Sequence, residues 1–495
     1  MRGSRPNLLL VITDQQRADT VTPGGPCLTP NLQRLAAEGA RFERCYAANP
    51  ICSPSRASLF TGHLPHSHGV TDVTHAVPAP EADLRPGMPF WSRALARAGY
   101  RTGYFGKWHV ERTDRLEEYG FGEYETELRL VGVQEHRGEL ARSLRVSRSG
   151  YRDLLIAGVT EARADQTHEH ALVTKGVEFI ERAVPGEPWA LVVSTEAPHD
   201  PYIAPREYFE RYDPAAIAEP ASFADPMTDK PAIYRRIREA WRDLAWDDYA
   251  FATACYLGLC SMLDDQVGRL LAALDATGQA DDTLVVFTSD HGDYLGAHGL
   301  LLKGVPAFEE AYRVPLVMRG PGVAPGVSVP GPVSLLDLPR TLVRLLLGEE
   351  FDCQGGELTG WLTGERDPGG EVGQLPVGAA PAGAGPVGDT PVRRSASAPG
   401  EAFAEFHGQR FRYTQRVLWR GDWKYVMNGF DQDELYDLAS DPHELRNLAA
   451  DPEHGPVLED MARRMWRWVK DTGDETLAEA HYGMFRFLPV GPGAG

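Results

Sequence analysis

Short apolar runs alternate with longer helical patterns as far as residue 347, and this alternation limits the fold more than any other feature of the sequence. Strands are predicted at residues 8–13, 100–105, 189–195, 283–289 and 314–318. Helices are predicted at residues 30–39, where a glycine closes the pattern, and at 90–99, 168–182, 249–276 and 335–347. Since a helix between two strands allows them to run parallel, we predict an α/β fold with a large, mostly parallel mixed sheet sandwiched by helices.

The composition changes after residue 364. Residues 365–400 are almost all glycine, proline, alanine, valine and polar residues, which is typical of a flexible insertion. Beyond it, short strands are predicted at 402–406, 412–420 and 423–427, and a last helix at 456–470. We therefore expect a main α/β domain over 1–364, the insertion over 365–400, and a small antiparallel α+β subdomain with its tail over 401–495.

The charge balance excludes one broad class of function. Fifty lysines and arginines against seventy aspartates and glutamates give a net charge of −20, which disfavours nucleic acid and anionic membranes as partners. The sequence shows no export signal and no apolar run of about 18 residues, which predicts a cytoplasmic protein. The six cysteines lack metal-ligand spacing, and we expect most of them to be buried thiols.

Polar residues follow four of the predicted strands directly. They are Asp14 and Gln15, Lys107 and His109, His199 and Asp200, and Asp290 and His291. Ligands of open α/β sheets bind beyond the carboxyl ends of the strands, so these side chains are expected at one site; the alternative is that each merely caps a strand in solvent. The carboxylates favour Ca²⁺ or Mg²⁺, and the imidazole keeps Mn²⁺ and Zn²⁺ open.

A second candidate feature is the segment 49–62, NPICSPSRASLFTG. Pro54 fits the first turn of a helix, which places Cys52 just ahead of the helix N-terminus, where backbone N–H groups favour negative charge. Arg56, one turn later, adds a forked cation suited to oxyanions. The plainer interpretation is a reactive or buried thiol beside a surface arginine.

These residues resemble a known family. Cys52-Ser53-Pro54-Ser55-Arg56 is similar to the C-x-P-x-R motif of the type I, formylglycine-dependent sulfatases of the alkaline phosphatase superfamily. Residues 99–109, GYRTGYFGKWH, resemble a second motif of that family. Further similar stretches lie at 29–32, 198–199, 289–293, 303–304, 313–316 and 434–438. The resemblance spans nearly all of the chain except 365–400 and implies an alkaline-phosphatase-like fold.

The resemblance also implies a cofactor and a modification. A formylglycine-generating enzyme would oxidise Cys52 to Cα-formylglycine, whose hydrate would be the nucleophile and a metal ligand. Asp14, Asp290 and His291 would complete the site of one divalent cation, with Gln15 as a further candidate ligand. Ca²⁺ is the expected ion, with Mg²⁺ and Mn²⁺ as alternatives.

The remaining roles are implied in the same way. Arg56 would hold the formylglycine, and Lys107 and Lys303 would bind sulfate oxygens. His199 would be the general acid for the leaving group, and His109 would assist release of the sulfo group.

Two pairs depart from many sulfatases, which carry Asp-Asp after the first strand and Asp-Asn after the later one. The pairs here, Asp14-Gln15 and Asp290-His291, are similar to those of the choline-sulfatase and phosphonate monoester hydrolase branch, whereas residues 107–109 look like a sulfatase proper. The leading hypothesis is therefore hydrolysis of a small aryl or alkyl sulfate ester. The alternatives are a phosphonate monoester or phosphodiester hydrolase with the same site, and a non-catalytic binding protein.

The end of the chain leaves the oligomeric state open. Residues 482–495 are apolar enough to dock, either across a subunit interface of a homo-oligomer or on their own domain.

Overall fold

The computed structural model describes residues 5–79, 82–113, 115–126, 140–147, 153–365, 400–429, 431–478 and 490–491. Its strands are β1 (Asn7–Thr13), β2 (Ala40–Tyr46), β3 (Arg101–Gly106), β4 (Glu123–Thr126), β5 (Leu140–Val146), β6 (Leu154–Thr160), β7 (Trp189–Ser194), β8 (Tyr202–Pro205), β9 (Thr283–Ser289), β10 (Arg313–Arg319), β11 (Val327–Ser334), β12 (Glu401–Gly408), β13 (Arg412–Arg420), β14 (Trp423–Asn428) and β15 (Glu434–Asp437). Its α-helices are α1 (Pro30–Ala37), α2 (Cys52–Thr61), α3 (Pro65–His68), α4 (Trp91–Arg97), α5 (His168–Glu181), α6 (Arg206–Phe209), α7 (Ala232–Arg238), α8 (Trp246–Ala276), α9 (Glu309–Tyr312), α10 (Leu338–Leu347), α11 (Thr359–Leu362), α12 (Gly455–Thr472) and α13 (Glu475–Ala478).

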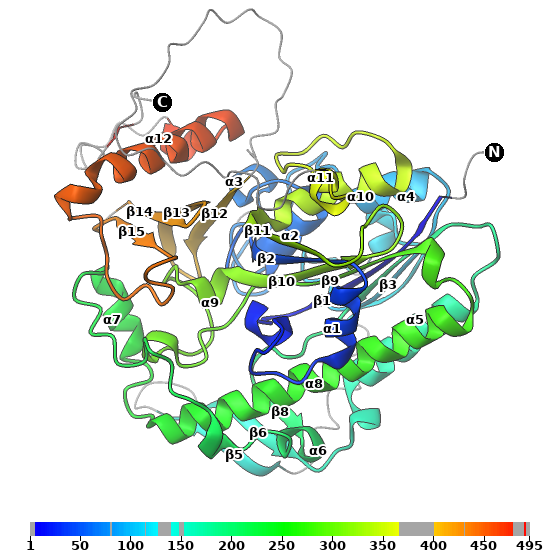
Figure 1. Ribbon diagram of the computed structural model, residues 1–495, viewed down its shortest axis with the longest axis horizontal. Coiled ribbons are helices and arrows are strands. Elements are labelled where there is room, and N and C mark those ends of the chain that lie inside the picture. The colour runs from blue at the N-terminus through cyan, green and yellow to red at the C-terminus, as the bar shows by residue number, and fades with distance from the viewer. Residues whose placement is uncertain are drawn as a thin grey trace, which may run out of the picture.

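A large mixed sheet forms the centre of the molecule (Figure 1). Within the described residues it has eight strands in the order β11-β2-β10-β9-β1-β7-β3-β4. Every neighbouring pair is parallel except β10 with β2 and β10 with β9, so the sheet is mostly parallel. The predicted α/β fold is confirmed.

The side chains of β1 show why both faces of this sheet must be covered. Leu8, Leu10 and Ile12 pack with residues of α2, α4 and α10 on one face. Leu9 and Val11 pack with residues of α1, α5 and α8 on the other. Since successive side chains of a strand point to opposite faces, a strand that is apolar throughout is stable only between two layers of helices.

The C-terminal part forms a second, antiparallel sheet in the order β12-β13-β14-β15, with α12 packed beside it (Figure 1). Its core includes Trp466 and Met461 of α12, but also Ala48, Leu64 and Leu336 from the main domain. The domain boundaries at 364 and 401 therefore stay a proposal. Residues 366–399, within the expected insertion, lie outside the described residues, as does most of the tail 482–495.

Several predicted boundaries shift by a few residues, and some strands were not predicted. Helix α1 ends at Ala37, and Gly39 does not close it in the left-handed conformation; a Cβ at Gly39 would instead collide with the carbonyl oxygen of Met318. Strand β2 (ARFERCY) and strand β11 (VSVPGPVS) were missed because charged residues interrupt the first and prolines the second. Strands β4, β5, β6, β8 and β15 were missed as well.

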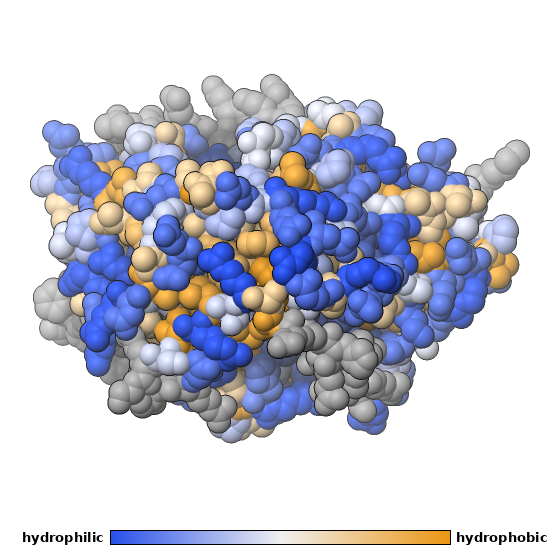
Figure 2. All heavy atoms as spheres, turned by 90° about the horizontal axis from the view of Figure 1, so that it is seen from below, coloured by the Kyte–Doolittle hydropathy of each residue, from blue (hydrophilic) through white to orange (hydrophobic). Residues whose placement is uncertain are grey.

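The surface and the cysteines agree with the composition. On the face in Figure 2, hydrophilic residues cover most of the surface and hydrophobic ones appear between them. All six cysteines are buried free thiols, which confirms that prediction. Among the described residues, no helix is long and apolar enough to cross a membrane.

Candidate active site

The register of the central strands aligns the residues that follow them. Thr13 of β1 pairs with Ser289 of β9, and Ile12 pairs with Ser194 of β7. Ser194 in turn pairs with Gly106 of β3. The residues directly beyond these four strand ends therefore meet at one edge of the sheet, as the sequence predicted.

Helix α2 brings Cys52 to the same edge. Cys52 is the first residue of the helix, and Ile51, not Cys52, is the residue ahead of it. The N–H of Ile51 donates to Asn49 Oδ1 at 2.9 Å, which fixes the turn into the helix. The Sγ atom of Cys52 lies 3.1 Å from His291 Nε2 and 3.7 Å from Asp14 Oδ1.

Four buried side chains form a candidate cation site: Asp14, Cys52, Asp290 and His291. One donor atom from each lies within 4.8 Å of the others. Nε2 of His291 is 3.7 Å from Oδ1 of both aspartates, while its Nδ1 is 3.0 Å from the carbonyl oxygen of Gly292. A histidine whose second nitrogen is held by a carbonyl is oriented as metal ligands usually are. Two carboxylates and an imidazole therefore fit a divalent cation.

Arg56 holds both aspartates through their other oxygens. Its Nε donates to Asp290 Oδ2 at 2.7 Å and its Nη2 to Asp14 Oδ2 at 3.0 Å. Its Nη1 donates to Ser194 Oγ and to the carbonyl oxygen of Lys107. Burial opposes its charge, but Asp290 and Asp14 raise its pKa, so it is a permanent buried cation. The fork leaves both Oδ1 atoms directed toward His291.

Lys107 adds a second cation. Its Nζ lies 2.9 Å from Asp14 Oδ2. Burial lowers the pKa of Lys107, but Asp14, together with Cys52 and Glu196, raises it, and the net direction is upward. Burial also opposes the charge of Asp14, yet Lys107, His199 and Arg56 hold the pKa of this carboxyl well below its usual range. The Asp14 carboxylate is therefore ionised throughout the neutral range.

Gln15 and Lys303 lie on the other side of the cluster. Gln15 has a left-handed backbone (φ 68°), and its N–H donates to Asp290 Oδ1 at 3.1 Å. Its side chain donates to Asp293 and accepts from Lys303 Nζ. A role for Gln15 as a metal ligand stays a prediction. Burial raises the pKa of Asp293 to about 6, against the hydrogen bonds from Tyr202 and Gln15.

His199 lies between Lys303 and Asp200. Its Nε2 is 2.6 Å from Lys303 Nζ and 3.9 Å from Asp14 Oδ1. Its Nδ1 is 2.6 Å from the carbonyl oxygen of Asp200 and 3.4 Å from Oδ1 of that carboxylate. Burial and Lys303 lower its pKa, but Asp200 and Asp14 raise it, and the net direction is upward. Such a histidine suits proton donation.

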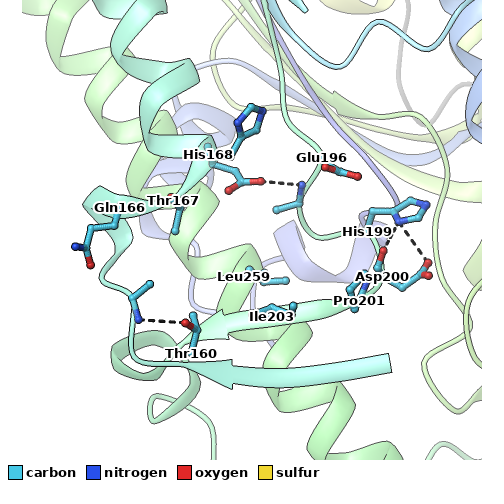
Figure 3. Close-up of a pocket in the computed structure, with 13 residues that line it drawn as sticks. Thr160, Gln166, Thr167, His168, Glu196, His199, Asp200, Pro201, Ile203 and Leu259 are labelled. Carbon is cyan, nitrogen blue, oxygen red and sulfur yellow. Dashed lines mark hydrogen bonds and ion pairs between the residues drawn. The ribbon is translucent and has the colours of Figure 1, made fainter. Parts of the chain in front are cut away.

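A pocket adjoins His199 (Figure 3). It has a volume of about 110 Å³, and its lining includes Glu169, Glu196 and Asp200. Figure 3 shows the imidazole of His199 on the side away from Thr160 and Thr167. His199 lines this acidic pocket and also contacts Lys303, so the pocket adjoins the site.

His109 lies farther out than Lys107. Its Nε2 is 3.0 Å from His75 Nδ1, and the two rings stack with centroids 5.0 Å apart. Burial, Lys107 and Arg56 hold its pKa well below the usual range, so the ring is neutral at pH 7. The structure thus brings together all the predicted site residues, with His109 at the rim.

Sequence reasoning missed three participants. Ser194 links Arg56 to the end of β7, Asp293 anchors Gln15, and His75 pairs with His109. Asp293 stands in the same short motif as Asp290, which is a usable signal. Ser194 and His75 carry none, because their contacts depend on strand register and loop path.

Comparison with known proteins identifies the class that this fold and site define. The family model described as Sulfatase matches residues 6–348. The chain belongs to the sulfatase family, within the alkaline phosphatase superfamily, and is a hydrolase acting on sulfate esters.

Individual relatives cover the C-terminal part as well. A choline-sulfatase of Rhizobium meliloti (strain 1021) is 31% identical over 473 residues, which is 92% of this chain and 85% of that protein. A solved phosphonate monoester hydrolase from Silicibacter pomeroyi is 26% identical with a TM-score of 0.74, over 96% of this chain and 97% of that one. Another, from Agrobacterium radiobacter, is 25% identical with a TM-score of 0.72, over 94% and 96%. The predicted family and fold are confirmed.

Proposed function

We propose that this protein hydrolyses small aryl or alkyl sulfate esters with Cys52 in the form of Cα-formylglycine. The observation that carries the proposal is the position of Cys52 at the first turn of α2, within hydrogen-bonding distance of His291 and close to Asp14. A formylglycine-generating enzyme would be the maturation partner. The hydrated aldehyde carries two hydroxyl groups, of which one would be the nucleophile. The other would lose its proton as the aldehyde re-forms and sulfate leaves, a route that a serine lacks.

A divalent cation would be held by Asp14, Asp290, His291 and residue 52, with Gln15 as a further candidate ligand. We propose Ca²⁺, because carboxylate oxygens dominate the site; Mg²⁺ and Mn²⁺ are the alternatives. When bound, the cation would acidify the nucleophilic hydroxyl and withdraw charge from a sulfate oxygen.

The remaining groups either orient residue 52 or act on the substrate. Arg56 would orient residue 52 through the aspartates that it holds. Lys107 and Lys303 would bind the sulfate oxygens and offset charge that develops in the transition state. His199 would donate a proton to the leaving group, and His109 would assist release of the sulfo group.

A second candidate function is hydrolysis of phosphonate monoesters or phosphodiesters at the same site. The similarity to two solved phosphonate monoester hydrolases over most of the chain favours it, together with the Asp14-Gln15 and Asp290-His291 pairs. Sulfuryl and phosphoryl transfer place similar charge on similar atoms, so one site can serve both.

Mass spectrometry of the peptide that contains Cys52, from a maturation-competent host, tests the modification. We expect loss of H₂S and gain of one oxygen atom; an unmodified cysteine in a host that matures other sulfatases would contradict the mechanism. The kcat/KM values for nitrophenyl sulfate and for phenylphosphonate esters then separate the two functions. Cys52→Ala in the same host should abolish turnover of both, and unchanged sulfatase activity would refute the proposal.

A further inference from the structure

The turn between β12 and β13 reaches the rim of the active site from the C-terminal sheet. Gln409 Oε1 lies 3.2 Å from the position that a Cβ on Gly304 would take, and Gly304 follows Lys303. On the opposite side, the N–H of Arg410 donates to Asp72 Oδ2 at 2.6 Å. The turn therefore bridges the loop of Lys303 and the loop that leads from Asp72 to His75.

Several basic side chains lie around His75 at this rim. His75, which pairs with His109, has its pKa lowered by burial and then by Lys107, Arg410, His199 and Arg112. All four of these neighbours are lysine, arginine or histidine side chains, which carry positive charge when protonated. The chain as a whole is acidic, with a net charge of −20, so a basic rim is a local feature and not a consequence of composition.

The backbone of Arg410 has a conformation that is unfavourable for an arginine. Its φ is 61°, in the left-handed region that glycine or asparagine adopts at lower cost. Its N–H bond to Asp72 fixes this conformation, and Gly408 (φ 113°) permits the tight turn because a Cβ there would collide with the carbonyl oxygen of Phe411. Non-glycine residues in strained conformations gather at functional sites.

The side chain of Arg410 is free to act on a ligand. Residue 410 is exposed, and among the described residues its guanidinium has no hydrogen-bond or ion-pair partner. Phe411, the next residue, is 47% exposed. The turn that reaches the rim therefore exposes a planar cation at residue 410 and an aromatic ring at residue 411.

We propose that Arg410 is a specificity-determining residue that binds an anionic substituent on the leaving group, so that the preferred substrates are aryl sulfates carrying a carboxylate or a second anionic group. A guanidinium fork matches a carboxylate in shape and charge. This inference rests on the proposed sulfatase function and specifies its substrate class. The opposing outcome is a preference for substrates with a cationic leaving group, which the acidic pocket beside His199 would bind.

Three substrates test the proposal with the matured full-length protein: phenyl sulfate, 3-carboxyphenyl sulfate and 3-(trimethylammonio)phenyl sulfate. We expect Arg410→Gly, which removes the guanidinium and relieves the backbone, to lower the kcat/KM ratio of the carboxylate to the unsubstituted ester about tenfold, mainly through KM. Arg410→Glu should shift preference toward the ammonium ester. Comparing each ratio between variants cancels the intrinsic reactivity of the esters.

Arg463→Ala is the matched control, because Arg463 is a half-exposed arginine of α12 and should keep the wild-type ratio. If phenyl sulfate is hydrolysed but the ratio is the same in wild type and Arg410→Gly, or the wild type prefers the ammonium ester, the inference is wrong and the proposed function stands. If protein with formylglycine at position 52 hydrolyses none of the sulfates, the proposed function fails and the inference with it.

Discussion

Arg56 organises the charges of the site. It is fully buried and donates to one oxygen of Asp14 and one of Asp290, so the remaining oxygens of both carboxylates face His291. Two carboxylates this close would otherwise repel each other and take up a proton. The arginine therefore helps to keep Asp14 ionised, and it orients the carboxylates of both aspartates, before any cation arrives.

Replacing Arg56 by lysine keeps the positive charge, yet it should strongly reduce both the stability and the activity of the protein. A lysine cannot donate to both carboxylates in a fork, and a buried charge left unpaired costs about 3 kcal/mol of unfolding free energy. Urea unfolding should show this loss, and sulfatase activity should fall at least about a hundredfold. Arg145→Lys, at a half-exposed pair with Asp153, should lose less than about 1 kcal/mol. Equal losses at the two positions would contradict this account.

Helix α2 is held in place by the C-terminal sheet. The N–H of Glu405 in β12 donates to the carbonyl oxygen of Ala48 at 2.9 Å, and Asn49 Nδ2 donates to the carbonyl oxygen of Glu405 at 2.7 Å. Asn49 also accepts from Ile51, the residue before Cys52. The position of the candidate nucleophile thus depends on a strand that lies far later in the chain.

Asn49→Asp isolates this link. An aspartate keeps the acceptor for Ile51 but loses the donor to Glu405 and places a carboxylate against its carbonyl oxygen. We expect a loss of about 1–3 kcal/mol in unfolding free energy and a lower kcat, because residue 52 is less well positioned. Denaturant unfolding and steady-state kinetics measure the two effects. Wild-type values for both would show that the strand does not position α2.

A pH-dependent contact joins α3 to the same strand. His66 Nδ1 lies 2.6 Å from Glu405 Oε1, and Glu405 raises the pKa of His66 although burial lowers it. Burial raises the pKa of Glu405, but His66 and Arg416 hold it well below its usual range. The stability that His66 contributes to the fold is therefore complete below its unfolded pKa of about 6.5 and is lost as pH rises through its raised pKa in the folded state. The stability that Glu405 contributes is present above its unfolded pKa of about 4.5 and is lost as pH falls through its lowered pKa in the folded state.

His66→Gln should accordingly destabilise the protein most near pH 5.5 and progressively less in alkaline solution. We expect a difference of about 1–3 kcal/mol at the lower pH. Urea unfolding of wild type and variant across this range is the measurement. A difference that stays constant with pH would mean that the pair is a neutral hydrogen bond.

The elements with one dominant periodicity could be predicted from the sequence, and the others could not. Strand β9 and helix α8 are apolar on a regular pattern, whereas β2 alternates arginine and glutamate with its apolar residues and pairs only in the folded sheet. Asp14 and Asp290 could be predicted as site residues because each directly follows a strand of this regular, apolar kind. Arg410 could not be predicted from the sequence, because its position at the rim depends on a hairpin from another sheet.

At the scale of the molecule, the C-terminal sheet shares a hydrophobic core with residues beside the site. Ala48 and Leu64, which flank α2, share a core with Met465 and Trp466 of α12. Contacts of this kind exclude water from a common interior, so loss of the sheet would expose apolar surface beside the site. We therefore expect site occupancy and global stability to be coupled.

Divalent cation should raise the melting temperature of the whole protein. A ligand that binds the folded state stabilises it by RT ln(1 + [L]/Kd), about 2.7 kcal/mol at a hundredfold excess over Kd, which corresponds to a rise of a few degrees in Tm. Thermal unfolding in a chelator and in graded Ca²⁺ or Mn²⁺ measures the shift. Asp290→Asn removes a charged donor and should abolish most of it, while Asp153→Asn, at an exposed ion pair with Arg145 just before β6, should keep it. Identical melting with chelator and with each ion would argue against a cation site at Asp14, Asp290 and His291.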